Sequence, residues 1–258
     1  MRVRRSKGSH AAIASDIVSI LEHRGKAGSW YLVILDEYRV ADPLGLADFL
    51  DVRQTHVKLV NERLYEGGRD IVIDMIVTTS DARAARARRR VGGKVPWILM
   101  WNLPRRAAEE LAGQLEIREE KELLWRLTGG NPRALELIKR DGLKRWIKSE
   151  VIGALSESLR PLSGKSELWG WISDIAEDPD RLVTYEEPEK PLAEALLGNN
   201  IVISTGVAHH MISDMPNKPW VGEYYAYQVP AYHYAIKAAA KRRDLAITPE
   251  EVIREAMA

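Results

Sequence analysis

Two adjacent carboxylates, Asp36 and Glu37, directly follow an apolar run in the segment WYLVILDEYR. A buried strand of a parallel sheet that ends in two acids can place one carboxylate on a magnesium ion, usually through water. The other carboxylate can then orient an attacking water. The same pattern also describes a strand that ends in a solvated acidic turn. The residue types alone leave both interpretations open.

Hydroxyl side chains end the next apolar segment, 71–79, where the chain reads Thr78-Thr79-Ser80-Asp81. A hydroxyl at the end of a neighbouring strand can contact the γ-phosphate of a nucleotide or the attacking water. A hydroxyl followed by an acid is equally typical of a helix cap, with Asp81 at the start of a helix. This segment therefore supports the catalytic interpretation of Asp36 only in combination with other motifs.

A third segment, LLWRLTGGNPRAL at 123–135, predicts two helices joined at a corner. The pair Gly129-Gly130 predicts the end of the first helix. Asn131 fits the N-cap of the second helix, and Pro132 fits its first turn. A corner of this kind requires no chemistry by itself.

The order and spacing of these segments resemble the archaeal ATPase family of P-loop proteins, within the AAA+/STAND group. The resemblance covers roughly residues 11–138. VILDE resembles the Walker B strand, IVTTSD the sensor strand, and ILMWNLPRRAAEELAGQL the passage into the helical lid. LTGGNPRAL resembles the Gly-Asn-Pro lid signature and is the most specific of the four matches.

The resemblance implies ATP and Mg²⁺ as cofactors and assigns roles to matching residues. Asp36 would act on the metal and Glu37 on the attacking water, so that both are catalytic. Ser80, or Thr79, would be the sensor. Pro132 would lie near the nucleotide base and Arg133 close to the phosphates.

One motif of the family is missing, because the 258 residues contain no G-x-x-x-x-G-K-[ST]. That glycine-rich loop supplies the backbone N–H groups and the lysine that hold the phosphates. We therefore expect this chain alone to bind ATP weakly or not at all, and to be inactive as an ATPase. Either the chain starts inside a longer gene product or it is a degenerate relative of the family.

A run of arginines occupies 81–94 and includes Arg86, Arg88, Arg89 and Arg90. In the family, such a segment could offer an arginine finger to the γ-phosphate of a neighbouring subunit. It could also contact DNA phosphates, which would make binding depend strongly on salt. A solvated helix rich in alanine and arginine is the third interpretation.

These residues must be positioned by alternating helices and strands. Apolar periodicity predicts helices around 13–21 and 46–64 and strands at 31–35, 71–79 and 97–101. Near-continuous apolar strands separated by helices favour a parallel sheet, here of about three strands, covered on both faces. Helices at 106–115, at 119–128 and from 132 onward would form the lid. The prediction for 1–142 is thus a partial, N-terminally truncated α/β P-loop-type core with a helical lid.

The remainder, 143–258, is predicted to be an α+β winged-helix domain. Helices at 146–159, 167–175 and 190–197 precede strands at 201–204 and 224–229, which is the order of a winged helix-turn-helix. Two more helices are expected at 231–243 and 249–257. An alternative function follows from this half, namely a non-enzymatic DNA-binding or regulatory protein.

The signals for nucleic acid or metal in this half are modest. Lys237, Lys241, Arg242 and Arg243 form a basic cluster on one helical face, but the helix at 190–197 is poorly charged for DNA. The tyrosines at 224–234 are expected in the core and at its rim rather than as a base-stacking platform. The adjacent histidines at 209 and 210 have only Asp214 nearby as a further metal ligand, so they are expected on the surface. Self-association or a partner protein stays an open alternative.

Composition limits the protein class. Hydrophobic residues make up 45 % of the chain, charged residues 29 %, and the formal net charge is +1. This balance argues against a bulk polycation for nucleic acid, although not against a local basic patch. With no cysteine, thiol catalysis and zinc–cysteine sites are excluded. No stretch approaches the roughly 18 apolar residues of a membrane helix, and a soluble cytoplasmic protein is expected.

Overall fold

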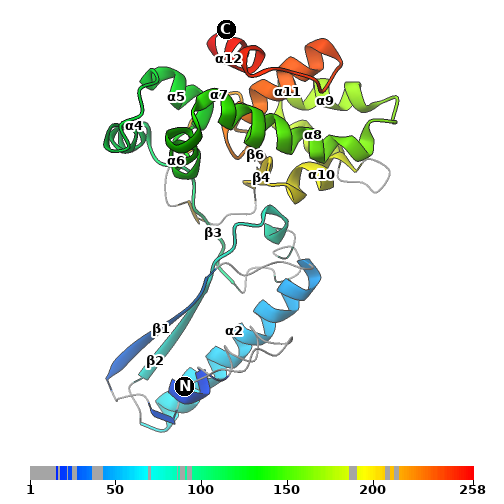
Figure 1. Cartoon of the computed structure of the whole chain (residues 1–258). Coiled ribbons are helices and arrows are strands. Elements are labelled where there is room, and N and C mark those ends of the chain that lie inside the picture. Colours follow the sequence, from blue (N-terminus) through cyan, green and yellow to red (C-terminus); the bar gives the residue numbers. More distant parts are fainter. Residues whose placement is uncertain are drawn as a thin grey trace. The chain divides into compact units, whose positions relative to one another are not determined.

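The computed structural model describes most of the chain and divides it into two compact units, Met1–Pro96 and Trp97–Ala258 (Figure 1). We call them the first unit and the second unit and describe each by itself. The described residues are 16, 18–21, 23–24, 28–36, 43–68, 71–85, 87, 91, 95–185, 191–206, 210–211 and 215–258. Glu37, Arg86, Arg88, Arg89, Arg90 and the first histidine of the pair lie outside them.

The first unit contains a β–α–β arrangement. Strand β1 (Ser29–Leu35) is followed by helix α2 (Pro43–Glu66) and strand β2 (Ile71–Val77). The two strands are parallel and pair in register from Ser29 opposite Ile71 to Leu35 opposite Val77. Helix α2 lies alongside the strand pair in Figure 1. The predicted parallel arrangement of these two strands is confirmed.

Only one face of this strand pair carries a core. Val33, Ile71 and Ile73 point toward α2, where they pack with Val60 and Leu64. Asn61 of α2 donates its amide to the Ile73 carbonyl at 2.9 Å and accepts from the Ile73 N–H at 2.9 Å. Both backbone polar groups of Ile73 are thus satisfied by a side chain and not by a further strand.

The opposite face of the strand pair is apolar and exposed. Its large side chains are between 42 % and 64 % exposed: Trp30, Leu32, Ile34, Val72 and Ile76. The described residues therefore cover one face of the sheet, whereas the sequence pattern predicted cover on both faces. Asp74 also lies on this face, and its carboxylate accepts a hydrogen bond from the Trp30 indole at 2.7 Å.

The prediction of about three strands in this sheet is wrong for the described residues, where the sheet has two. Strand β3 is only Ile98–Leu99, and it pairs in parallel with β5 (His210–Met211) in the second unit. The residues that follow β3 are held within the second unit by hydrogen bonds from Asn102 Nδ2 to the Gln228 carbonyl and from the Leu103 N–H to the Gly130 carbonyl.

The second unit is mostly helical. Helix α11 packs against α9, α12, α5 and the π-helical turn η3, and therefore lies at the centre of this unit (Figure 1). The helices are α4 (Arg105–Gln114), α5 (Lys121–Thr128), α6 (Pro132–Asp141), α7 (Leu143–Trp146), η3 (Ile147–Ile152), α8 (Gly153–Leu159), α9 (Leu168–Glu177), α10 (Leu192–Gly198), α11 (Pro230–Arg242) and α12 (Pro249–Met257). Short 3₁₀ turns are η1 (Ala82–Ala84) in the first unit, and η4 (Arg160–Leu162) and η5 (Pro179–Tyr185) in the second.

Two short strands complete the second unit. Strand β4 (Val202–Ser204) pairs with β6 (Tyr225–Tyr227) in antiparallel register. Tyr227 is fully buried and donates its hydroxyl to the Ile175 carbonyl of α9 at 2.7 Å. The coarse prediction of a mixed α/β chain is confirmed. No described helix combines the length and the apolar character required to span a bilayer.

Helices from both sides of residue 142 pack together in the second unit. Helices α11 and α12 contact α5, and α6 contacts α7. By contacts, the chain divides after Pro96. The division of the chain into a core with lid at 1–142 and a winged-helix domain at 143–258 rests on sequence pattern and stays a prediction.

Candidate functional site

The candidate site lies where β1 and β2 both end. The Thr78 N–H donates to the Leu35 carbonyl at 2.9 Å and extends the strand ladder by one step. Asp36 and Thr78 therefore leave the sheet side by side. The Thr78 hydroxyl donates to Asp36 Oδ1 at 2.5 Å. Asp36 is exposed.

The next residues of this edge form a small capping structure. Asp81 is the N-cap of η1 and accepts from the Arg83 N–H at 2.9 Å. The Arg83 guanidinium also donates to both Asp81 oxygens, at 3.0 and 2.7 Å. Burial would raise the pKa of Asp81, but the hydrogen bonds and charge of Arg83 outweigh burial and hold the pKa below its usual value. Asp81 therefore starts a helical turn, as the capping interpretation predicted.

The two predicted sensor residues lie beside this cap. Thr79 accepts the Asp81 N–H at 3.2 Å through its hydroxyl. Ser80 is exposed. The residue that contacts the carboxylate is Thr78, which the sequence analysis quoted but did not select. The sequence alone does not give this contact, because it depends on the strand register, in which Leu35 pairs with Val77 and Asp36 then lies beside Thr78.

The oxygen atoms at this edge fit a magnesium ion held through water. Mg²⁺ prefers oxygen ligands and keeps several waters, so one carboxylate and a neighbouring hydroxyl suit it. No three acidic or histidine side chains come together in the described part of the chain, so the protein offers no closed metal cage there. The residues do not fit a triphosphate equally well, because the sequence lacks the phosphate-binding loop.

The lid-like corner of the second unit folds as its sequence predicts. Gly129 ends α5 with a left-handed φ of 57°. Asn131 accepts from the Ala134 N–H at 2.9 Å and caps α6. Pro132 and Arg133 occupy the first turn of α6, and both are exposed. These two residues belong to the second unit, whereas Asp36 and Thr78 belong to the first.

Two of the four charges in the basic cluster at the end of α11 are paired within the chain. Lys241 donates to Glu255 at 2.6 Å, and Arg242 donates to Glu251 at 2.8 Å. Helix α10 presents its apolar residues to the core rather than to solvent: Leu192, Leu196 and Leu197 are buried. Tyr225, Tyr227, Tyr232 and Tyr234 are also buried, as expected for core residues.

Comparison with models of known protein families, with curated proteins and with solved structures finds no match for this chain. Its function must therefore be argued from the arrangement of its own residues.

Proposed function

We propose that the first unit is the magnesium-binding part of a P-loop-type nucleoside triphosphatase of the AAA+/STAND kind. The observation that supports this most is the hydrogen bond from Thr78 to Asp36 at the carboxyl ends of two parallel strands. In open α/β sheets, ligands bind at that edge. An apolar strand that ends in a carboxylate, beside a strand that ends in a hydroxyl, provides oxygen ligands there.

Each residue has a role in this proposal. Asp36 holds the magnesium ion through water, and Thr78 fixes one carboxylate oxygen so that the other stays directed to the metal. Glu37 orients the attacking water, as the resemblance implies. The metal, when bound, neutralises the charge of the phosphates during their transfer. Thr79 and Ser80 follow Thr78 in the chain, and Ser80, or Thr79, would act as the sensor of the γ-phosphate.

The second unit would supply the lid and a signalling module. By resemblance, Pro132 would lie near the base and Arg133 near the phosphates. We further propose that α8, α9 and α10 with β4 and β6 form a winged-helix module. Because α10 buries its leucines, this module is better suited to protein contacts than to DNA. Nucleotide turnover would then change the arrangement of core and module.

The phosphate-binding loop has no counterpart in the 258 residues. We therefore expect these residues alone to bind Mg–ATP weakly and not to hydrolyse it. A test of the proposal must consequently detect a weakly bound metal and cannot rely on turnover.

Iron-mediated cleavage meets this requirement. Fe²⁺ replaces Mg²⁺ at oxygen sites. With added hydrogen peroxide it forms hydroxyl radicals that cut the chain beside the metal, and ascorbate reduces the resulting Fe³⁺ back to Fe²⁺. With ATP at about 5 mM, a concentration suited to millimolar affinity, we expect cuts beside Asp36 and beside Thr78. The variant Asp36→Asn should lose both cuts, since an amide is a poor ligand for the ion.

Asp74→Asn is the matched control. Asp74 is an exposed aspartate in the same strand pair, but it lies within β2 and not at its end. This variant should keep the cleavage pattern. Cuts that persist in Asp36→Asn, or an absence of cuts at this edge in the unmodified protein, would contradict the proposed magnesium site.

A further inference from the structure

A cavity of about 240 Å³ lies within the second unit, made entirely of that unit's residues. It is lined by the start of α4, by α5, by α11 and by the loop before β6. The lining residues are Arg105, Glu122, Trp125, Arg126, Lys218, Pro219, Trp220 and Tyr234. The proposed magnesium site uses none of them.

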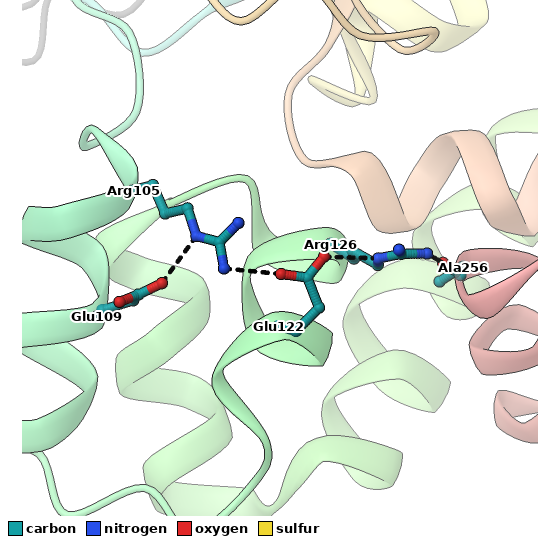
Figure 2. Close-up of polar contacts among 5 residues, drawn as sticks. All are labelled: Arg105, Glu109, Glu122, Arg126 and Ala256. Carbon is teal, nitrogen blue, oxygen red and sulfur yellow. Dashed lines mark hydrogen bonds and ion pairs between the residues drawn. The ribbon is translucent and has the colours of Figure 1, made fainter.

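Positive charge prevails in this lining, with three cationic side chains and one carboxylate. Figure 2 shows Glu122 between Arg105 and Arg126. Glu122 accepts from Arg105 at 2.7 Å and from Arg126 at 2.8 Å. Its hydrogen bond with Arg126, more than any other cause, keeps the pKa of Glu122 below its usual value. Glu122 therefore stays ionised and offsets one of the three positive charges.

The two arginines keep donors that these contacts do not use. A guanidinium has five N–H groups. Arg105 uses two of them, on Glu109 and Glu122, which leaves three. Arg126 also uses two, on Glu122 and on the Ala256 carbonyl, which leaves three. Lys218 has no ion pair with any described residue.

Aromatic rings form the rest of the wall. Trp220 is 4 % exposed, and its ring meets Tyr234 edge-on at a centroid distance of 6.1 Å. The Trp220 indole N–H is buried and finds no hydrogen-bond acceptor among the described residues. The Tyr234 hydroxyl likewise makes no hydrogen bond in the described part of the chain. The Tyr234 hydroxyl is therefore the unused donor of this wall, whereas the Trp220 N–H is too deeply buried to reach a ligand in the cavity.

We propose that this cavity binds a small planar anion, namely a single aromatic ring that carries a carboxylate or a phosphate. The ring would pack against the tryptophans, and the anionic group would accept from the unused donors of the arginines, Lys218 and Tyr234. Pockets for drug-sized ligands usually measure about 300–1,000 Å³, so a cavity of about 240 Å³ suits a one-ring compound. Cations are disfavoured, because one positive charge remains after Glu122 and the Glu109 carboxylate paired with Arg105 are both counted.

Benzoate and phenyl phosphate are the probes, one for each anionic group. Their binding is followed by the NMR signals of the tryptophan indole N–H groups, assigned with a Trp220→Phe sample. We expect the Trp220 signal to shift at probe concentrations below about 10 mM, a range suited to ligands of this size. Acetate and inorganic phosphate, which lack the ring, should bind about tenfold more weakly. Benzylammonium, a ring with a positive charge, should cause no shift.

Two substitutions test the assigned donors. Lys218→Ala and Tyr234→Phe should each weaken probe binding about fivefold, the effect of one hydrogen bond. Lys165→Ala is the matched control, because Lys165 also lies against a tryptophan ring, 5.8 Å from the centroid of Trp171, but does not line the cavity. Its affinity should equal that of the unmodified protein.

Three results would overturn the proposal. They are an unchanged Trp220 signal with both probes, equal affinity for the probes and their ringless analogues, and full affinity in both Lys218→Ala and Tyr234→Phe. A shift with only one of the two probes would support the cavity and identify its anionic group as carboxylate or phosphate.

Discussion

His233 illustrates how burial controls a titratable residue in this protein. Its ring is 1 % exposed and packs against Tyr227 and Tyr234 in the core of the second unit. No described residue offers a hydrogen-bond partner to its Nδ1 atom. Burial, with a smaller effect from the charge of Lys237, lowers the pKa of His233 from 6.5 to about 4. The folded protein therefore keeps this histidine neutral in conditions where the unfolded chain protonates it.

Stability should consequently fall in acid. Between pH 6.5 and 4 the unfolded chain binds a proton at His233 that the folded protein does not, so the free energy of unfolding decreases as pH decreases. The pKa difference means that the free energy of unfolding is lower by about 3 kcal/mol below pH 4 than above pH 6.5. About 2 kcal/mol of this loss has occurred by pH 5. Above pH 6.5 the contribution is fully present. Urea unfolding at pH 7.5 and pH 5 measures it.

The variant His233→Phe isolates this contribution, because it keeps an aromatic ring in the core and removes the titration. Its loss of stability between pH 7.5 and pH 5 should be smaller than that of the unmodified protein by about 2 kcal/mol. His23→Gln changes an exposed histidine and should behave as the unmodified protein does. Identical pH dependence in His233→Phe and the unmodified protein would rule out this assignment.

At the scale of elements, local sequence signals predicted much of the second unit. Gly129 and Asn131 mark the end of α5 and the start of α6, because a left-handed turn and an N-cap are set by the residues that form them. The pairing of β3 with β5 could not be predicted, since residues 98 and 210 are distant in sequence and each strand has two residues. The contact of Thr78 with Asp36 could not be predicted either, because it depends on a strand register that the apolar pattern of the two segments does not determine.

The cavity beside Trp220 could not be predicted for the same reason as the β3–β5 pair. Its lining comes from three separate segments of the chain, represented by Arg105, Lys218 and Tyr234. The first and the last of these residues are more than a hundred positions apart in sequence. No periodicity links them, and each residue alone is typical of a solvated or a core position. Tertiary packing, which single-sequence patterns do not encode, brings them together.

The corner between α5 and α6 gives a prediction at this scale. Gly130 has φ of 82°, and a Cβ there would collide with the Leu103 carbonyl oxygen. Gly142 has nearly the same φ, 83°, but a Cβ there would meet open space. Gly142→Ala should cost about 1–3 kcal/mol from backbone strain alone, because its φ of 83° and ψ of 152° lie in a region essentially restricted to glycine. Gly130→Ala should cost about 4 kcal/mol or more, because backbone must also move.

Urea unfolding of both variants, measured at the same pH, tests this difference. The pair is informative because the substitution is the same and the φ angles are nearly equal, whereas the surroundings of the added Cβ differ. Equal destabilisation by the two variants would mean that the close approach of residues 103 and 130 does not constrain the fold.

At the scale of the whole molecule, the two units differ in how completely each buries its apolar residues. The second unit encloses a core shared by α5, α9, α11 and α12. The described part of the first unit has a two-stranded sheet with one covered face. Two-stranded sheets are marginal in water unless further strands or a packed helix support them. The units should therefore differ in stability.

A fragment of residues 97–258 should fold alone and unfold cooperatively, because the core around α11 comes from within this range. A fragment of residues 1–96 should unfold at lower urea concentration or self-associate, since Trp30, Leu32 and Ile34 expose an apolar face. Circular dichroism with urea and analytical ultracentrifugation of both fragments measure these outcomes. A monomeric 1–96 fragment as stable as 97–258 would show that the exposed face of the strand pair needs no further cover. Self-association that Trp30→Lys abolishes would instead identify that face as a surface which must be buried.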